Sequence, residues 1–268
     1  MIDADERLLL EGQRLLKRLQ APPFRSDVAA AYFDNLEARL SRLQRRAEPG
    51  RLVLGLGPGR CGSTTLTALF KTAPDCCATH ENPAIIDWTP RPEQIQFHLK
   101  RFSMLVDYFE VVFDAAHWWI NLVDLIGRNI EQVKFIILRR PAHQCAISFN
   151  NLGRHDGVYI NNWAPPGSPA WTVGPWNQTY PTYDVPAHLS RDEAKLVMTL
   201  EYVNSYYDAC GKLSDQVGAN AISVDTETLS STLVQRDIFD FAECAGVGGD
   251  FWLNRQNYIE GASAEWLY

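Results

Sequence analysis

The sequence predicts an α/β protein in which a central, mainly parallel sheet of about four to five strands lies between layers of helices. Three observations carry this prediction. Short apolar runs alternate with longer stretches of helical periodicity. The run that ends at Leu138 is almost entirely apolar, as in strands buried on both faces. Glycines, acidic residues or arginines follow these runs directly, where a parallel sheet presents its ligand-binding edge.

The composition is that of an ordinary globular protein, with 46% hydrophobic residues in a chain of 268. This length suits one large α/β domain or two small ones. A net charge of −7 predicts neither a nucleic-acid-binding nor a membrane-binding surface. The acidic start, together with the lack of an apolar run of about 18 residues, favours a cytoplasmic protein. The six cysteines lack metal-ligand spacing, so no metal is expected.

Residues 1–48 are predicted to form a helical hairpin. Leucines at helical spacing favour a helix over residues 5–20, which the Pro22–Pro23 pair ends. Ser26 is a candidate N-cap for a second helix. The hairpin is expected to pack on the core or on a second subunit, which makes a homodimer possible. Residues 49–268 would form the main α/β domain.

The stretch from Arg51 to Phe70 is the one around which the chain is organised. It begins with an apolar strand, turns through three glycines and a proline, and continues as a helix with an apolar face. A strand, a glycine-rich turn and a helix N-terminus together make an anion site, because free backbone N–H groups point outward and the helix dipole favours negative charge.

The glycine spacing is that of a nucleotide-binding P-loop with one departure. Gly57 and Gly62 fit, but Ser63 stands where a Walker A loop has its lysine, and Thr64 follows. The missing lysine argues against ATP or GTP. Arg60 supplies positive charge inside the loop instead.

At this point the chain resembles sulfotransferases that use 3′-phosphoadenosine-5′-phosphosulfate (PAPS). Their 5′-phosphosulfate loop places a basic residue before a small residue, a glycine and a Ser/Thr pair, as residues 60–64 do here. The resemblance implies a P-loop-like three-layer sandwich, PAPS as donor, 3′,5′-adenosine bisphosphate (PAP) as product and no metal. The implied donor-binding residues of this loop are Gly59, Arg60, Cys61, Gly62, Ser63, Thr64 and Thr65.

Two further strands are expected before the middle of the chain. A short one ends at His80–Glu81, and a helix over residues 90–109 follows. The next strand covers residues 110–114 and leads to His117, with a helix from Trp119 onward. Polar side chains thus stand at two more strand ends, on the edge where ligands bind.

A pair of arginines follows the fourth predicted strand, residues 134–138. Charged groups at the end of a buried strand need an anionic partner. The pattern resembles the second PAPS signature of sulfotransferases, in which an arginine ending a strand and a serine on the next helix hold the 3′-phosphate. Ser148 is the matching serine. The proline after the pair favours Arg139 as the phosphate ligand, whereas the spacing to Ser148 favours Arg140, and both stay open.

Residues 153–188 have no periodicity but many aromatic side chains, which predicts a lid over the acceptor. A capping box at Ser190–Glu193 opens a long helix. A fifth strand over residues 220–225 and a closing helix that ends at Gly246 complete the resemblance, which covers about residues 50–246. The expected acceptor-binding side chains are His80, Asp114, Trp118, Asp156 and Trp163.

Sulfuryl transfer needs a base to take the proton of the acceptor. Glu81 is the first candidate and His117 the second, each at the position where one branch of the family places its base. Asp114 is the third, or it recognises a cationic acceptor group, and His80 is placed to orient Glu81. No lysine occurs between Lys100 and Lys134, so contact with the leaving oxygen is expected from Arg60.

We therefore predict a PAPS-dependent sulfotransferase that acts on a hydroxyl or amine of a small-molecule acceptor, for example a natural product. Two alternatives remain at this stage. One is a nucleotide or nucleoside kinase with a degenerate P-loop, and the other is an anion-binding scaffold without catalytic activity.

Overall fold

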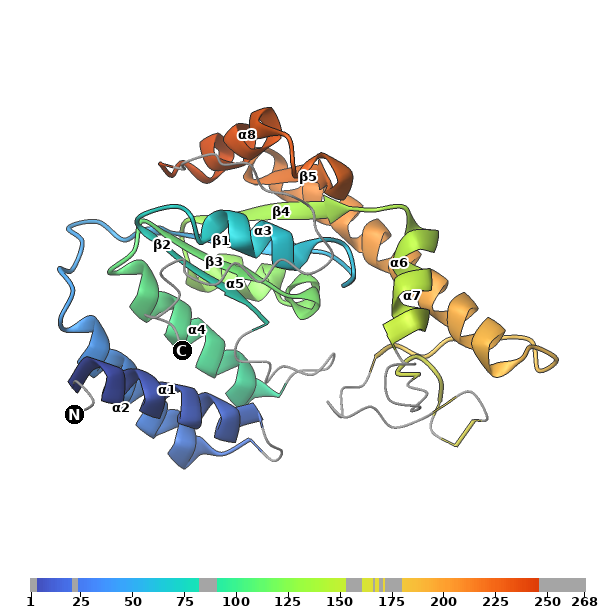
Figure 1. Cartoon of the computed structure of the whole chain (residues 1–268), viewed down its shortest axis with the longest axis horizontal. Coiled ribbons are helices and arrows are strands. Elements are labelled where there is room, and N and C mark those ends of the chain that lie inside the picture. Colours follow the sequence, from blue (N-terminus) through green and yellow to red (C-terminus); the bar gives the residue numbers. More distant parts are fainter. Residues whose placement is uncertain are drawn as a thin grey trace.

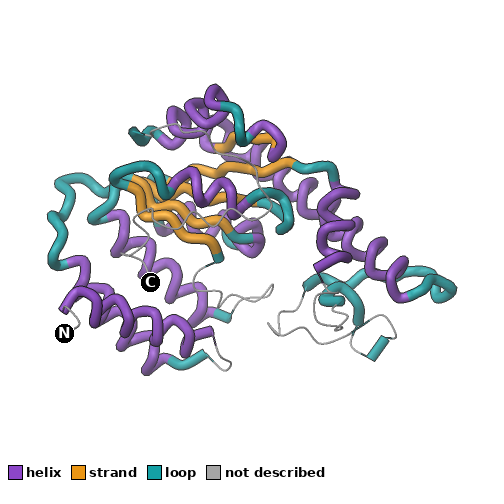
Figure 2. The backbone as a smooth tube through the Cα atoms, in the orientation of Figure 1, coloured by secondary structure: helices purple, strands orange, loops and turns teal. Residues whose placement is uncertain are grey.

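The computed structural model describes residues 4–20, 24–81, 91–152, 161–165, 167–168, 171 and 180–245. Its centre is a sheet of five parallel strands in the order β2-β3-β1-β4-β5. The strands are β1 (Arg51–Leu56), β2 (Cys76–His80), β3 (Val111–Ala115), β4 (Val133–Arg139) and β5 (Ala221–Asp225). They form one layer between helices (Figure 2). The predicted α/β class with a parallel sheet is confirmed.

Helices cover both faces of the sheet (Figure 1). The α-helices are α1 (Ala4–Gln20), α2 (Ser26–Leu40), α3 (Ser63–Phe70), α4 (Pro92–Val106), α5 (Val123–Asn129), α6 (Ala142–Leu152), α7 (Arg191–Val217) and α8 (Thr232–Ala242). Short 3₁₀ helices are η1 (His117–Asn121), η2 (Gly218–Asn220) and η3 (Thr226–Thr228). The chain leaves β1 toward one edge and returns through β3 toward the other. Right-handed connections therefore place α3 on one face and α4 and α5 on the opposite face.

Aromatic contacts hold the layers together. Phe70 of α3 stacks on Phe113 of β3 with ring centres 4.1 Å apart, and it meets Phe239 of α8 edge-on. On the other face, Phe102 of α4 packs on Trp119 of η1 at 5.3 Å. The central strand β1 is buried from Leu52 to Leu56, because β3 and β4 flank it and both faces are covered.

The first two helices lie side by side and pack on α4. Tyr32 and Phe33 of α2 contact Phe97 of α4, with ring centres 5.2 and 4.9 Å apart. The Asn35 side chain donates a 3.0 Å hydrogen bond to the carbonyl of Leu8 in α1. The hairpin thus adds a further layer below α4 in Figure 1. The homodimer stays a prediction.

The capping box at the start of α7 is confirmed, since the side chains and backbone amides of Ser190 and Glu193 bond reciprocally. The helix expected from Trp119 is divided into η1 and α5, with Leu122 between them in a non-helical conformation. The expected cap at Ser26 is wrong: Arg25 precedes the helix and its side chain bonds Asp27 instead.

Candidate active site

Because all five strands are parallel, their carboxyl ends lie along one edge of the sheet, and the segments that follow them are neighbours. Polar or glycine-rich residues follow each of these ends. They are the turn 57–62 after β1, His80–Glu81 after β2, His117 after β3, Arg139–Arg140 at β4 and Thr226 after β5. This edge is the candidate active site.

The turn after β1 has the backbone of an anion-binding loop. Gly59 and Gly62 have φ angles of 89° and 92°, in the left-handed region that glycine tolerates. Arg60 shares this region with a φ of 56°, which is rare for a residue with a side chain. Helix α3 begins at Ser63, and no side chain caps its first amides. Those N–H groups can therefore serve a bound anion.

The loop packs too closely for larger residues. A Cβ at Gly57 would lie 2.2 Å from Sγ of Cys61, and one at Gly62 would lie 2.6 Å from Cγ2 of Thr226. Cys61 is buried, and burial raises its pKa to about 12, so its thiol is neutral and fills space beneath the loop. Its carbonyl accepts a hydrogen bond from the hydroxyl of Thr226. The backbone amide of Cys61 is therefore the group that can take part in ligand binding.

Side chains from α6 and from the end of β4 reach the loop. Nε of Arg60 donates a 3.0 Å hydrogen bond to Oγ of Ser148 on α6. Nη1 of Arg140 donates a 2.7 Å hydrogen bond to the carbonyl of Arg60, and its Nε donates to Gln144 at 3.2 Å. The two segments identified in the sequence as phosphate-binding thus meet at Arg60.

Arg139 takes a different direction from Arg140. Its guanidinium lies over the ring of Tyr207 on α7, 4.9 Å from the ring centre. The Tyr207 hydroxyl accepts from the backbone amide of Arg140 and donates to its carbonyl, both at 3.0 Å. Tyr207 therefore fixes the end of β4 and separates the two arginine side chains.

Three arginines follow or end strands at this edge of the sheet. Within the described residues, Arg60, Arg139 and Arg140 form no ion pair with a carboxylate. The chain as a whole is acidic, with a net charge of −7. Guanidinium groups without acidic partners attract an anion, and their planar fork of donors suits phosphate.

The loop is tied to the end of β2 by a serine–histidine contact. Oγ of Ser63 lies 2.8 Å from Nε2 of His80. Burial lowers the pKa of His80, although the negative charge of Glu81 acts against this shift, so the ring is neutral at pH 7. His80 therefore contacts Ser63, whereas the sequence led us to expect it to orient Glu81.

His117, rather than His80, contacts Glu81. Its Nδ1 lies 3.3 Å from Oε1 of Glu81, so the two residues considered as competing bases form one pair. Burial alone would raise the pKa of Glu81, but the hydrogen bond from His117 and the charges of His117 and His80 outweigh it, and the pKa is lowered. Glu81 also has a φ of 49°, a strained conformation of the kind that gathers at functional sites.

Tyr180 completes this group and was not expected from the sequence. Its ring stacks on that of His117, with centres 5.2 Å apart and planes 15° apart. It belongs to the aromatic-rich segment predicted as a lid. Trp163 of the same segment is buried against Phe149, Tyr180 and Tyr202. Asp156 and most of that segment lie outside the described residues, so the lid and the role of Asp156 stay predictions.

Asp114 and Trp118 are buried beside the pair. Asp114 accepts hydrogen bonds from the hydroxyl of Thr79 and from Nε1 of Trp119, the latter at 2.7 Å. Both of its oxygens are therefore occupied inside the protein. Trp118 lies edge-on to His117 with ring centres 4.8 Å apart, and its indole N–H has no hydrogen-bond partner among the described residues.

Sequence reasoning missed the tyrosines that hold this edge together. Besides Tyr180 and Tyr207, Tyr206 of α7 accepts a 3.1 Å hydrogen bond from the amide of Gly57. The adjacent tyrosines in a long helix gave no signal of this role, because their partners lie in the loop and at the end of β4.

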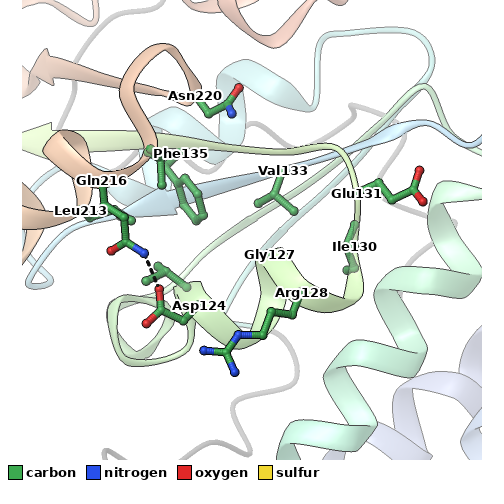
Figure 3. Close-up of a pocket in the computed structure, with 12 residues that line it drawn as sticks. Asp124, Gly127, Arg128, Ile130, Glu131, Val133, Phe135, Leu213, Gln216 and Asn220 are labelled. Atoms are coloured by element: carbon green, nitrogen blue, oxygen red, sulfur yellow. Dashed lines mark hydrogen bonds between the residues drawn. The ribbon is translucent and has the colours of Figure 1, made fainter.

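A cavity of about 360 Å³ lies elsewhere (Figure 3). Its lining comes from α5, the start of β4 and the end of α7, and Gln216 bonds Asp124 across it at 2.9 Å. These are the amino ends of the strands, opposite the loop. This cavity is therefore separate from the candidate active site.

Among the described residues, no cluster of three or more His, Cys, Asp or Glu side chains is arranged to hold a metal ion. Within the same part of the chain, every helix is too short or too polar to cross a membrane.

The fold matches that of two solved sulfotransferases. The sulfotransferase domain of the olefin synthase from Synechococcus PCC 7002 aligns with a TM-score of 0.50 and 14% identity, over 76% of this chain and 78% of that chain. The sulfotransferase STF9 from Mycobacterium avium aligns with a TM-score of 0.51 and 10% identity, over 90% of this chain and 72% of that chain. The chain therefore has a sulfotransferase fold. No protein-family model matches the sequence, and no curated protein sequence matches it.

Proposed function

We propose that this protein is a PAPS-dependent sulfotransferase that sulfates a hydroxyl or amine of a small molecule. The observation that carries the proposal is the meeting of two cationic segments at one residue. Arg60 of the loop bonds Ser148 of α6 and accepts from Arg140 at the end of β4. A ligand with anionic groups at two separate positions, such as the 5′ and 3′ groups of PAPS, suits this arrangement.

The residues present fit such a donor. The uncapped amides at the start of α3 and the Arg60 guanidinium would hold the phosphosulfate. Arg140 and Ser148 would hold the 3′-phosphate, since both contact Arg60. Arg139 stacks on Tyr207 and would contribute long-range charge. A Walker lysine is missing, and its position carries Ser63, whose hydroxyl contacts His80.

The reaction would displace the bisphosphate from sulfur. As the acceptor oxygen or nitrogen bonds to sulfur, the bond from sulfur to the bridging oxygen breaks, and its electron pair stays on the phosphate oxygen. Arg60 and the loop amides would stabilise that developing charge. The proton of the acceptor would pass to Glu81, which its lowered pKa keeps ionised at neutral pH.

His117 would orient the carboxylate of Glu81 and would not itself act as the base. Its Nδ1 bonds the carboxylate, and Tyr180 stacks on the other side of the imidazole and limits its rotation. Trp118 and Trp163 were expected to bind the acceptor, but they are 1% and 3% exposed. They would support His117 and Tyr180, which they contact, rather than touch the acceptor.

Calorimetry with PAP, in the presence and absence of magnesium, tests the donor. We expect PAP to bind without magnesium, and Arg60→Ala to weaken binding at least tenfold. Arg236→Ala is the matched control, because Arg236 lies exposed on α8 beside Asp237. Preference for Mg–ATP would support a kinase instead.

Transfer of radiolabelled sulfate from PAPS to a panel of phenols, alcohols and amines then tests catalysis. PAP binding without any sulfate transfer would indicate an anion-binding scaffold without catalytic activity.

A further inference from the structure

Asp114 lies between the two segments that carry the Glu81–His117 pair. In the sheet it is the partner of Thr79 on β2, the residue directly before His80. Successive side chains of a strand point to opposite faces. His80 thus reaches Ser63 on the α3 side, while Thr79 and Asp114 face the α4 side and contact each other there.

Each oxygen of the Asp114 carboxylate accepts one hydrogen bond. Oδ1 accepts from the Thr79 hydroxyl, and Oδ2 accepts from Nε1 of Trp119 at 2.7 Å. Thr79 lies two residues before Glu81, and Trp119 lies two residues after His117. One buried carboxylate is therefore bonded to both chain segments whose ends form the pair.

The pair depends on how these segments are placed. The distance from Nδ1 of His117 to Oε1 of Glu81 is 3.3 Å, near the upper limit for a hydrogen bond, so a small displacement of either segment would separate them. The amide of Glu81 continues the ladder by donating to the carbonyl of Ala115 at 3.0 Å. This bond holds the end of β2, and the amide of Ala116 holds the chain before η1 by donating to the carbonyl of Gly55 at 3.2 Å. The bond from Trp119 to Asp114 ties η1 itself, which carries His117.

Asp114 and a charged group that acts on it are buried. Both Asp114 and Arg101 of α4 are 1% exposed, and the Arg101 guanidinium is the positive charge that acts on the carboxylate. Cys77 of β2 and Glu81 are the other titratable groups that act on it, and neutral His98 of α4 lies edge-on to Trp119. Burial raises the pKa of Asp114 to about 7 against these favourable contacts.

We propose that Asp114 is a positioning residue, which holds the end of β2 and the start of η1 so that Glu81 and His117 stay in hydrogen-bond contact. It acts through that pair and does not touch the acceptor. This inference rests on the proposed function, in which Glu81 takes the acceptor proton, and it replaces the expectation that Asp114 is a base or recognises a cation.

Asp114→Asn is the first test, because an amide keeps the shape but replaces one acceptor oxygen with an NH₂ donor, so it cannot accept from both Thr79 and Trp119. We expect PAP affinity to change less than threefold, since the loop is held by other contacts. The kcat should fall about tenfold to a hundredfold with little change in KM for PAPS, because misplacement of catalytic groups costs rate rather than binding. Asp124→Asn is the control, since it also removes a carboxylate that accepts one hydrogen bond, far from the site.

The pH profile separates positioning from a general loss of structure. In the wild type, kcat should fall as pH drops through about 7, when the Asp114 carboxyl gains a proton and loses an acceptor position. This limb should be absent in Asp114→Asn. Glu81 titrates lower, because its pKa lies below the ordinary value, so its limb is distinct. Retention of the limb near 7 in Asp114→Asn would overturn the proposal.

Thr79→Val is the second variant, because it removes only the hydroxyl and keeps the buried shape. We expect at least a fivefold loss of kcat at unchanged PAP affinity, whereas a change below twofold would contradict the proposal.

The nitrogen-15 resonance of the Trp119 indole gives a reading without any turnover. It should titrate near pH 7 in the wild type and stay flat in Asp114→Asn. If it does so but the wild type transfers no sulfate, the proposed function is wrong and the structural role of Asp114 is retained. If sulfate transfer occurs and the indole does not titrate, only the positioning role of Asp114 is wrong.

Discussion

Nε of Arg60 donates a 3.0 Å hydrogen bond to Oγ of Ser148, which lies 88 residues further along the chain. This bond joins the glycine-rich loop after β1 to the helix after β4. It sets the distance between the two segments that we propose bind the anionic groups of the donor.

Ser148→Ala should weaken PAP binding about tenfold, because it removes a hydrogen bond to a charged group and, under the proposed function, one to the 3′-phosphate. Calorimetry measures the change. Ser103→Ala is the control, since Ser103 lies exposed on α4. Equal affinities for wild type and Ser148→Ala would show that α6 does not reach the ligand.

Arg139 and Arg140 should differ in what they bind. Arg140 adjoins the loop, so Arg140→Ala should reduce the preference for PAP over AMP, which lacks the 3′-phosphate, by about tenfold or more. Arg139→Ala should leave that preference within about twofold and lower stability by roughly 1 kcal/mol through the lost contact with Tyr207. The reverse pattern would assign the 3′-phosphate to Arg139.

Glu81→Gln should keep PAP affinity and lower kcat by about 10²- to 10⁴-fold, the range for a general base. His117→Ala should have a smaller effect, about tenfold to a hundredfold, because His117 only holds the carboxylate. Steady-state kinetics of both variants decide between the roles. A larger loss for His117→Ala would make the histidine the base.

Gly57→Ala should destabilise the protein by about 1–3 kcal/mol, because the new methyl would lie 2.2 Å from Sγ of Cys61. Adding Cys61→Ala should recover part of that loss, since the thiol is the atom in the way. Gly127→Ala is the control, because that position in α5 has open space around it and should be neutral or slightly stabilising. Thermal or urea unfolding would measure all three; additive effects of Gly57→Ala and Cys61→Ala would contradict the contact.

Asp114 should make stability depend on pH in an unusual direction. Its pKa is raised to about 7 in the folded state, so its contribution is fully present below its ordinary pKa and is lost as pH rises through 7. The difference is on the order of 4 kcal/mol at most. Asp114→Asn should therefore gain stability relative to the wild type between pH 5 and 8. A constant difference across this range would show that Asp114 titrates normally.

Local patterns in the sequence predicted most of the elements that form this site. The apolar strand, glycine turn and helix at 51–70 needed only short-range information, and so did the arginine pair at the end of β4. The roles of individual residues were harder to predict. His80 was expected to orient Glu81, but it faces α3 because alternate residues of β2 point to opposite faces.

Hydrophobic period and glycine spacing act over a few residues, so they were enough to predict the fold class and the edge of the sheet where we propose that anions bind. Only the tertiary structure decided that Ser148 reaches Arg60, that His117 bonds Glu81 and that Asp114 lies buried behind both. These partners depend on which strands are neighbours in the order β2-β3-β1-β4-β5. That order results from packing the whole chain, and no short stretch of sequence contains it.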